Sequence, residues 1–322
     1  MNIDKPTRIL AILLAAGALS VASAQRVATL EIEVENSVVY RYDQGDPSLW
    51  AKTSTPVPAA FDKAFVDFCQ LGDIVSVNGS PAKGLHMTCG TRMGFSATPQ
   101  PGFAIADVSM GSGRQECNWE LYTAEGRFVG RFVDGGFFPH AVQGGAGAYF
   151  GATGEHQSTG VAPARVASVT EDPSRRRVNG GGGKYRVTYV IKPAVWPEIV
   201  LIDGAPAVFH SDLETPVDDA HPAQSGETII IVAKGLGPTL PGVVPQGARV
   251  FASQPPFNEV NSPVEVTVSG AAGEILNKIG WPGTTDTYRV DVRLPSGLTP
   301  GTAKLVLTSA WIPSEEVAIR IR

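Results

Sequence analysis

Alternation of apolar and polar residues is the feature that most constrains the fold of this chain. In Thr29–Glu35, written TLEIEVE, every second residue is apolar and most of the others are glutamate. Successive side chains of a β-strand point to opposite faces, so such a segment has one buried face and one wet face. Lys184–Tyr189 repeats the pattern, and further alternating runs lie between the two segments. The chain is therefore predicted to be built from strands.

Turn-forming residues separate these alternating runs. The 322 residues include 36 glycines and 25 prolines, a composition that favours short strands joined by many turns into an antiparallel barrel or sandwich. The glycine-rich stretch 144–154 lacks the spacing of a dinucleotide-binding loop, because its third glycine comes one residue too late and no helical pattern follows. We expect these glycines to form a tight corner between two strands.

The N-terminus predicts export. Lys5 and Arg8 precede a short apolar run that ends in Ala22-Ser23-Ala24, as in a secretory signal peptide. We expect cleavage after Ala24 and a secreted, periplasmic or cell-surface location; the alternative is an N-terminal anchor helix. No other stretch is long and apolar enough for a membrane span. The net charge of −5 does not indicate the basic surface that binds nucleic acid, so no nucleic-acid partner is expected.

The glycine-rich stretch also carries a family resemblance. VQGGAGAYFGATGEH, Val142–His156, resembles the strand-turn-strand segment of the dirigent and allene oxide cyclase-like barrels. The resemblance extends over roughly residues 25–193 and implies an antiparallel eight-stranded barrel with a cavity for a small apolar molecule. Plant members of that group direct the coupling of phenolic radicals or cyclise an unstable epoxide. Their catalytic residues do not align with this chain, so none is carried over.

A second resemblance covers nearly all of residues 203–322. PAVFHSDLETPVDDAHPAQSGETIIIVAKGLGP, Pro206–Pro238, is similar to the opening of an immunoglobulin-like (Ig-like) C-terminal module of exported Acidobacteria proteins of the Solibacter type. Similarity continues through YRVDVRLPSGLTPGTAKLVL to the terminal VAIRIR. The resemblance implies a bacterial, exported protein and no chemistry, and about 120 residues of evenly spaced strands suit an Ig-like sandwich.

Two prolines in Lys192–Pro197 interrupt regular strand pairing and mark a boundary. The predicted class is all-β, an antiparallel eight-stranded barrel followed by an Ig-like β-sandwich. The expected divisions are a signal peptide over residues 1–24, a dirigent-like barrel over 25–193, a linker over 194–202 and the sandwich over 203–322.

Three cysteines remain after signal cleavage, namely Cys69, Cys89 and Cys117. Export permits a disulfide, and an odd count leaves one thiol over. Cys89 and Cys117 both lie in strand-like runs, among apolar residues at alternate positions; Leu85 and Met87 share the face of Cys89. The sequence leaves two alternatives: a Cys89–Cys117 disulfide, or three buried thiols that act as small apolar residues.

Two neighbouring strands supply the candidate ligand-binding residues. If Arg131 faces solvent, Phe132 and Asp134 face inward beside Trp119 of the preceding strand. Trp119, Phe132 and Asp134 are therefore the candidate ligand-binding residues. A carboxylate among these rings would have a raised pKa and could bind a polar ligand or act as an acid. The alternative, which we favour, is that Asp134 begins a turn with the two following glycines and is solvated.

No residue set has the spacing of a metal or catalytic motif. The five histidines lack a His-x-x-x-His spacing, and Cys-x-x-Cys is absent, so we expect no metal, no cofactor and no catalytic residue. Arg175–Arg177 precedes a run of four glycines. We expect a flexible hairpin tip there, with an anion-binding loop as the alternative.

These observations favour a secreted or cell-surface binding protein. Its barrel would hold a small apolar molecule or a glycan, and its Ig-like domain would act as a spacer or docking module. One alternative is a dirigent-like or cyclase-like enzyme or a stereo-directing isomerase, which we favour less because no acid–base pair emerges. The other is a purely structural extracellular protein, for which a barrel without an enclosed cavity would be evidence. The oligomeric state is left open.

Overall fold

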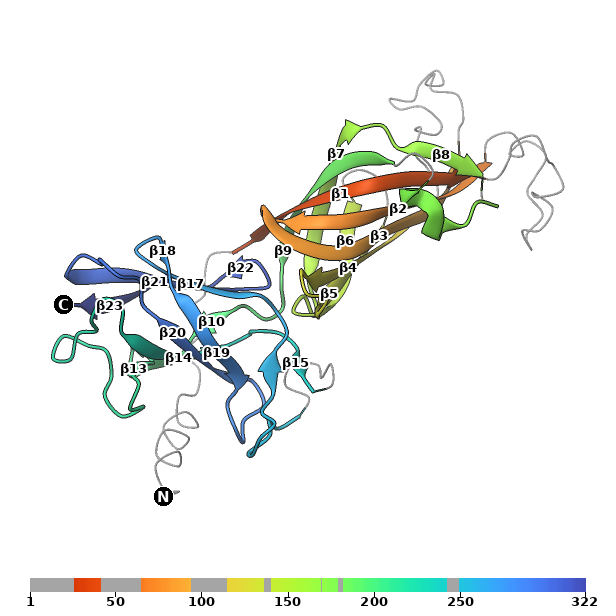
Figure 1. The fold of residues 1–322 in the computed structure, drawn as a ribbon. Helices are drawn as coiled ribbons and strands as arrows, with labels where there is room; N and C mark the ends of the chain where they lie inside the picture. The colour runs from red at the N-terminus through yellow and green to blue at the C-terminus, as the bar shows by residue number, and fades with distance from the viewer. Residues whose placement is uncertain are drawn as a thin grey trace, which may run out of the picture. The chain divides into compact units, whose positions relative to one another are not determined.

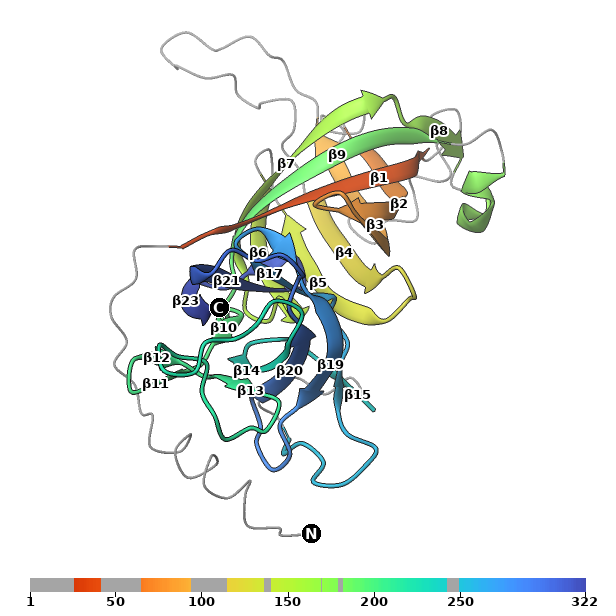
Figure 2. The same ribbon diagram turned by 60° about the vertical axis from the view of Figure 1, so that its left-hand side comes forward.

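The computed structural model describes residues 26–41, 65–93, 115–135, 140–168, 170–178, 182–241 and 249–322. They divide into two compact units, Ala28–Ala194 and Val195–Arg322, and residues 26–27 associate with the second (Figures 1 and 2). The signal peptide expected over residues 1–24 lies outside the described residues. Within the described part of the chain, no helix has the length and apolar character needed to cross a membrane.

The first unit confirms the predicted barrel. Eight strands pair in the order β2-β3-β4-β5-β6-β7-β9-β1, and β1 pairs back onto β2, so the sheet closes with every one of these pairings antiparallel. The strands are β1 (Ala28–Arg41), β2 (Phe65–Val77), β3 (Ser80–Met93), β4 (Gln115–Thr123), β5 (Phe128–Gly135), β6 (His140–Gly147), β7 (Thr153–Ala162) and β9 (Gly183–Lys192).

Alternation decides which side chains enter the barrel. On β9, Tyr185, Val187, Tyr189 and Ile191 are buried, while the residues between them are exposed or half-buried. The pattern seen in the sequence of β1 and β9 is thus confirmed as an inside-outside pattern. Burial of these apolar side chains contributes about 25 cal/mol per Å² of apolar surface removed from water.

The glycine-rich stretch is the predicted corner between β6 and β7. Gly147 has a φ of 67°, a region that L side chains rarely adopt. A Cβ on Gly145 would lie 2.1 Å from the carbonyl oxygen of Tyr149, so only glycine fits there. The chain can therefore turn back closely enough to place the Tyr149 side chain inside the barrel, where it is fully buried.

The expectation of a flexible tip at Arg175–Arg177 is wrong. These residues belong to a short 3-10 helix, η1 (Pro173–Arg177), which follows β8 (Arg165–Ser168), a strand paired in parallel with β1. The side chain of Asp172 accepts a hydrogen bond from the backbone N–H of Ser174 and caps the helix. Arg176 is buried and pairs with Asp73 of β2, which fixes the segment to the barrel.

The prediction of a Cys89–Cys117 disulfide is also wrong. Cys89 lies directly opposite Cys69 in the β2–β3 register, with a Cα–Cα distance of 4.1 Å, and these two residues form the disulfide. Cys117 lies opposite Thr88 instead. Residues directly opposite share a face, and neighbours along a strand do not, so Cys89 and Cys117 point to opposite sides of the barrel wall.

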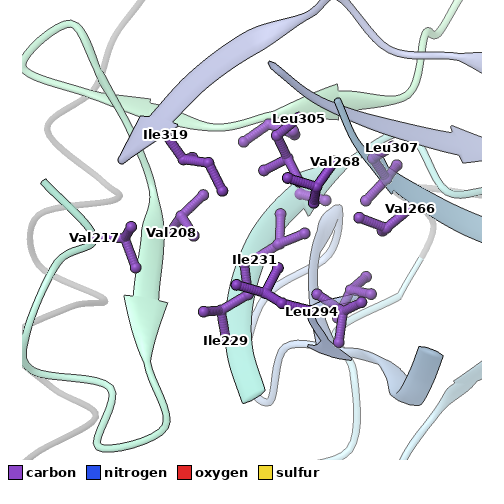
Figure 3. Close-up of a cluster of buried hydrophobic side chains, with 14 of the residues drawn as sticks. Val208, Val217, Ile229, Ile231, Val266, Val268, Leu294, Leu305, Leu307 and Ile319 are labelled. Atoms are coloured by element: carbon purple, nitrogen blue, oxygen red, sulfur yellow. The ribbon is translucent and has the colours of Figure 1, made fainter. Parts of the chain in front are cut away.

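The second unit contains two antiparallel sheets around one apolar core. One sheet has the order β10-β14-β20-β19-β16-β15, with β13 paired to β14; the other has the order β18-β17-β21-β22, with β23 paired to β21. Figure 3 shows Ile229 and Ile231 of β14 in the same cluster as Val266 and Val268 of β17. The two sheets therefore pack face to face as a β-sandwich.

The strands of this unit are short. Their bounds are β10 (Glu198–Ile199), β11 (Leu201–Ile202), β12 (Ala205–Pro206), β13 (Val208–His210), β14 (Thr228–Lys234), β15 (Thr239–Leu240), β16 (Glu259–Val260), β17 (Val264–Val268), β18 (Ala271–Ala272), β19 (Glu274–Gly280), β20 (Thr287–Arg293), β21 (Gly301–Ser309), β22 (Ile312–Pro313) and β23 (Val317–Ile321). The expected linker over 194–202 is thus partly strand: β10 pairs with β14, and Val200 is buried against Val232 and Trp281.

Candidate functional site

Aromatic rings fill the middle of the barrel. Trp119 of β4 lies opposite Phe132 of β5, and both side chains are almost fully buried. The ring of Tyr189 from β9 stacks on Phe132 at a centroid distance of 4.8 Å and meets Trp119 edge-on at 5.4 Å. Tyr149 stacks on the Phe132 ring at 4.3 Å. The structure thus brings the predicted residues Trp119 and Phe132 together in the barrel interior.

Three histidines join these rings. His86 of β3 stacks on Trp119 with a centroid distance of 3.8 Å. His140 of β6 and His156 of β7 lie opposite each other, and their rings stack at 4.6 Å. His156 also stacks on Tyr189 at 4.7 Å. Sequence spacing did not reveal this group because its members come from three strands; strand parity together with the register would have found it.

Asp134 of β5 lies inside the barrel, 1% exposed, and is not the solvated turn residue that we favoured. Its Oδ2 accepts a hydrogen bond of 2.6 Å from the Tyr189 hydroxyl and lies 3.2 Å from Nε2 of His156. Burial alone would raise the pKa of Asp134, but the contacts with His156, Tyr189 and Cys117 outweigh burial and hold it below its usual value. The raised pKa expected for an inward Asp134 is therefore wrong in direction.

Cys117 lies beside Asp134 across the β4–β5 pair and is a buried free thiol. The hydroxyl of Thr88 donates to its Sγ at 3.1 Å. Burial, together with the nearby Asp134 carboxylate, raises the pKa of the Cys117 thiol. The ligand atoms of Cys117, Asp134, His140 and His156 all lie within 4.8 Å of one another, so these four residues could hold a metal ion.

A chain of hydrogen bonds leads to this cluster from His86. The Tyr185 hydroxyl bonds to Nδ1 of His86, and Nε2 of His86 lies 2.6 Å from the Thr88 hydroxyl. Burial lowers the pKa of His86 to about 3, so the ring is neutral at ordinary pH. A neutral ring that accepts from Tyr185 at Nδ1 carries its proton on Nε2 and donates it to Thr88, which in turn donates to Cys117.

We expect the buried His86 to make the barrel less stable in mild acid. Between pH 6.5 and about 3, the unfolded histidine is protonated and the folded one is not, so the free energy of unfolding falls as the pH falls. The fall attributable to this residue is roughly 1–2 kcal/mol for each pH unit.

Urea unfolding between pH 4.5 and 7, in the presence of a chelator, measures this dependence for the wild type and His86→Gln. Glutamine cannot titrate, so its curve should be flatter. The lowered pKa values of the carboxylates add their own slope below about pH 5, but they do so in both proteins. Equal slopes for the two proteins would contradict the prediction.

A cavity of about 390 Å³ lies against these rings and extends along β7 and β9. Its wall includes Trp119 and the rings of the three histidines and Tyr185, together with the polar side chains of Gln70, Thr88 and Ser158. Ser158 and Gly160 are exposed, so the cavity reaches solvent. Of the predicted ligand-binding residues, Trp119 lines the cavity, whereas Phe132 and Asp134 lie behind the wall and do not.

These features define a closed antiparallel barrel with a polar, histidine-rich interior and a solvent-accessible cavity. No protein-family model matches the chain, and a search of curated proteins finds no match. Among solved structures, the N-terminal domain of the Streptococcus gordonii adhesin Sgo0707 aligns over 94% of this chain and 93% of its own, at 8% identity and a TM-score of 0.18. A likeness of this size carries no argument about fold or function.

Proposed function

We propose that the chain is a secreted or cell-surface binding protein whose barrel takes up a small ligand that has a planar ring and hydrogen-bonding groups. The cavity supports this proposal most directly, because its volume of about 390 Å³ is in the range of small-molecule sites. Rings of Trp119 and the histidines, each at most 4% exposed, form part of the wall, and Gln70, Thr88 and Ser158 add polar groups. This lining favours a mixed ligand over the purely apolar molecule that the dirigent-like resemblance implied.

The location and the second domain belong to the same proposal. The signal-peptide pattern that ends at Ala24 supports export. The C-terminal resemblance relates the sandwich to an Ig-like module of exported bacterial proteins, so this domain would act as a spacer or docking element.

Native mass spectrometry of protein purified from its own host tests whether the barrel binds a small molecule. A retained small molecule at one per chain supports the proposal, whereas a folded protein that retains nothing and takes up no aromatic probe counts against it.

An isomerase or cyclase is the second candidate, and one contact favours it. The Tyr185 hydroxyl and the His86 ring are hydrogen-bonded at the cavity wall, an arrangement that can pass a proton to or from a bound molecule. Incubating the retained compound with fresh protein separates the candidates, because a binding protein returns it unchanged and an isomerase returns a product of equal mass.

Filling the cavity with Gly160→Phe is expected to abolish ligand binding while leaving the fold intact. A Cβ at Gly160 meets nothing within 4 Å, and Gly160 lies opposite the inward-facing Tyr185, so the new side chain starts with room and points into the cavity. Titration with 2-naphthol, followed by tryptophan fluorescence, should show the dissociation constant rising by at least about tenfold, because lost apolar contact of this size is worth more than 1.4 kcal/mol.

Gly144→Phe is the matched control. A Cβ at Gly144 also meets nothing within 4 Å, and Gly144 lies opposite Val133, whose side chain is exposed. This variant adds the same ring to the outer face of the barrel and should bind 2-naphthol as the wild type does. Equal binding by the two glycine variants would show that the ligand does not occupy this cavity.

A further inference from the structure

The four buried donor residues of the barrel come from four consecutive strands. Cys117 of β4 lies opposite Asp134 of β5, and His140 of β6 lies opposite His156 of β7. Because paired residues share a face, the register points all four side chains into the barrel. Their donor atoms lie within 4.8 Å of one another, and each residue is at most 4% exposed. One sulfur, one carboxylate oxygen and two imidazole nitrogens therefore surround a single small volume.

A second observation is that two buried atoms of this group, one on Asp134 and one on His156, make no hydrogen bond with a described residue. The Oδ1 atom of Asp134 is buried and makes no hydrogen bond with any described residue, although Oδ2 is bonded to Tyr189. Nδ1 of His156 is likewise buried without a hydrogen-bond partner among the described residues. Unsatisfied buried polar atoms are costly, and a bound ion can satisfy them.

We propose that the barrel binds one zinc ion through Cys117, Asp134, His140 and His156. Thiolate, imidazole and carboxylate are the donor types that zinc accepts, and four of them complete a tetrahedral set. Binding releases the thiol proton of Cys117 to solvent as the sulfur–zinc bond forms. The thiolate and the Asp134 carboxylate together then neutralise the two positive charges of the ion, so the buried site has no net charge.

The surrounding residues fit the role of outer partners of a metal. Tyr189 donates to the carboxylate of Asp134, and Thr88 donates to the sulfur of Cys117, so each anionic ligand is held by a hydrogen bond from outside the set. The side chains of His140 and His156 also line the cavity, which gives an ion a path from solvent to the site.

This site does not depend on the proposed ligand-binding function, and the two are separable. Cys117 and Asp134 do not line the cavity, and Gly160 contributes no donor atom. At equilibrium, Gly160→Phe should therefore lose 2-naphthol binding and still bind the metal, although the ion can enter more slowly, whereas Cys117→Ser should lose the metal.

Cobalt(II) substitution tests the site directly in the full-length chain. The protein is stripped with a chelator, passed through a desalting column and titrated with cobalt(II) alone. A tetrahedral cobalt(II) ion with a thiolate ligand has strong visible bands and a sulfur-to-cobalt charge-transfer band in the near ultraviolet. The chain has three cysteines, and two form the disulfide, so this band can arise only from Cys117. We expect the band to saturate at one cobalt per chain and to disappear when one equivalent of zinc is added.

Variants identify the ligands. Cys117→Ser should abolish the charge-transfer band and weaken zinc binding by at least about 100-fold, more than the loss of an outer partner costs. If Cys117→Ser does not fold, His140→Gln provides the same comparison for zinc affinity. His210→Gln, which removes a half-buried histidine of the sandwich, is the control and should bind as the wild type does. A folded wild type that takes up no zinc, or a cobalt complex without the thiolate band, would overturn the proposal.

Discussion

Replacing Trp119 with alanine is expected to lower the free energy of unfolding of the barrel by about 3–5 kcal/mol, the range for emptying a core position of an aromatic side chain. The Trp119 ring is 1% exposed and contacts His86, His156 and Tyr189 at centroid distances of 3.8, 5.7 and 5.4 Å. Alanine removes all three contacts and leaves a void that strands on both sides cannot fill without breaking their register.

Urea unfolding monitored by hydrogen exchange at β4 and β9 amides measures this effect for the barrel alone. Trp119→Phe is the control, because it keeps an aromatic ring at the centre of the cluster and should cost less than half as much. The sandwich amides should be unchanged in both variants, since Trp119 belongs to the first unit. A loss below about 1 kcal/mol for the alanine variant would show that the ring cluster does not support the barrel.

The second large effect is expected from Asp73→Ala. Asp73 is 8% exposed and accepts hydrogen bonds from Arg176, from Nε of Arg177 at 2.6 Å and from Asn36 at 3.0 Å. Burial alone would raise the pKa of Asp73, but these contacts outweigh it and hold the pKa below its usual value. Removing the carboxylate leaves the guanidinium of Arg176, itself 7% exposed, without its ion-pair partner, which costs about 3–5 kcal/mol.

Arg177→Ala is the matched control for this prediction. Arg177 pairs with the same carboxylate, but its side chain is 56% exposed, so its removal should cost less than about 1 kcal/mol. The measurement is urea unfolding, with susceptibility to trypsin at Arg175–Arg177 as a local readout. If the two variants lose the same stability, burial of Arg176 is not what makes the pair important.

Most of the fold that could be predicted from the sequence followed from the alternation of apolar and polar residues. The alternation in Thr29–Glu35 and Lys184–Tyr189 predicted strands with one buried face, and both segments are barrel strands with that pattern. Glycines 144–154 predicted a corner and not a phosphate loop, and the positive φ of Gly147 shows why glycine is needed there. These are local properties, because chain torsions and period-two burial depend on a few consecutive residues.

The candidate site was predictable only in part. The alternation of side chains along β4 and β5 placed Trp119 and Phe132 correctly on the inner face. On β3, however, the apolar face is the outer one. Leu85 and Met87 are half-buried on the outside, while His86 lies in the core. The hydrophobic pattern cannot decide which face of such a strand points inward, because residues on both faces are at least half-buried. The prediction of a Cys89–Cys117 disulfide was wrong for a related reason, because a shift of one residue in register moves a cysteine to the opposite face of the sheet.

The amino-acid sequence by itself determined the strands, their turns and the boundary between two β units, because these follow from side-chain alternation and backbone freedom over short distances. Strand pairing and closure of the barrel decided the rest. They brought Cys117, Asp134, His140 and His156 from four strands to one point and buried Arg176 on Asp73, and the β2–β3 register joined Cys69 to Cys89. Such contacts depend on which strands pair and in which register, and that is a property of the whole sheet.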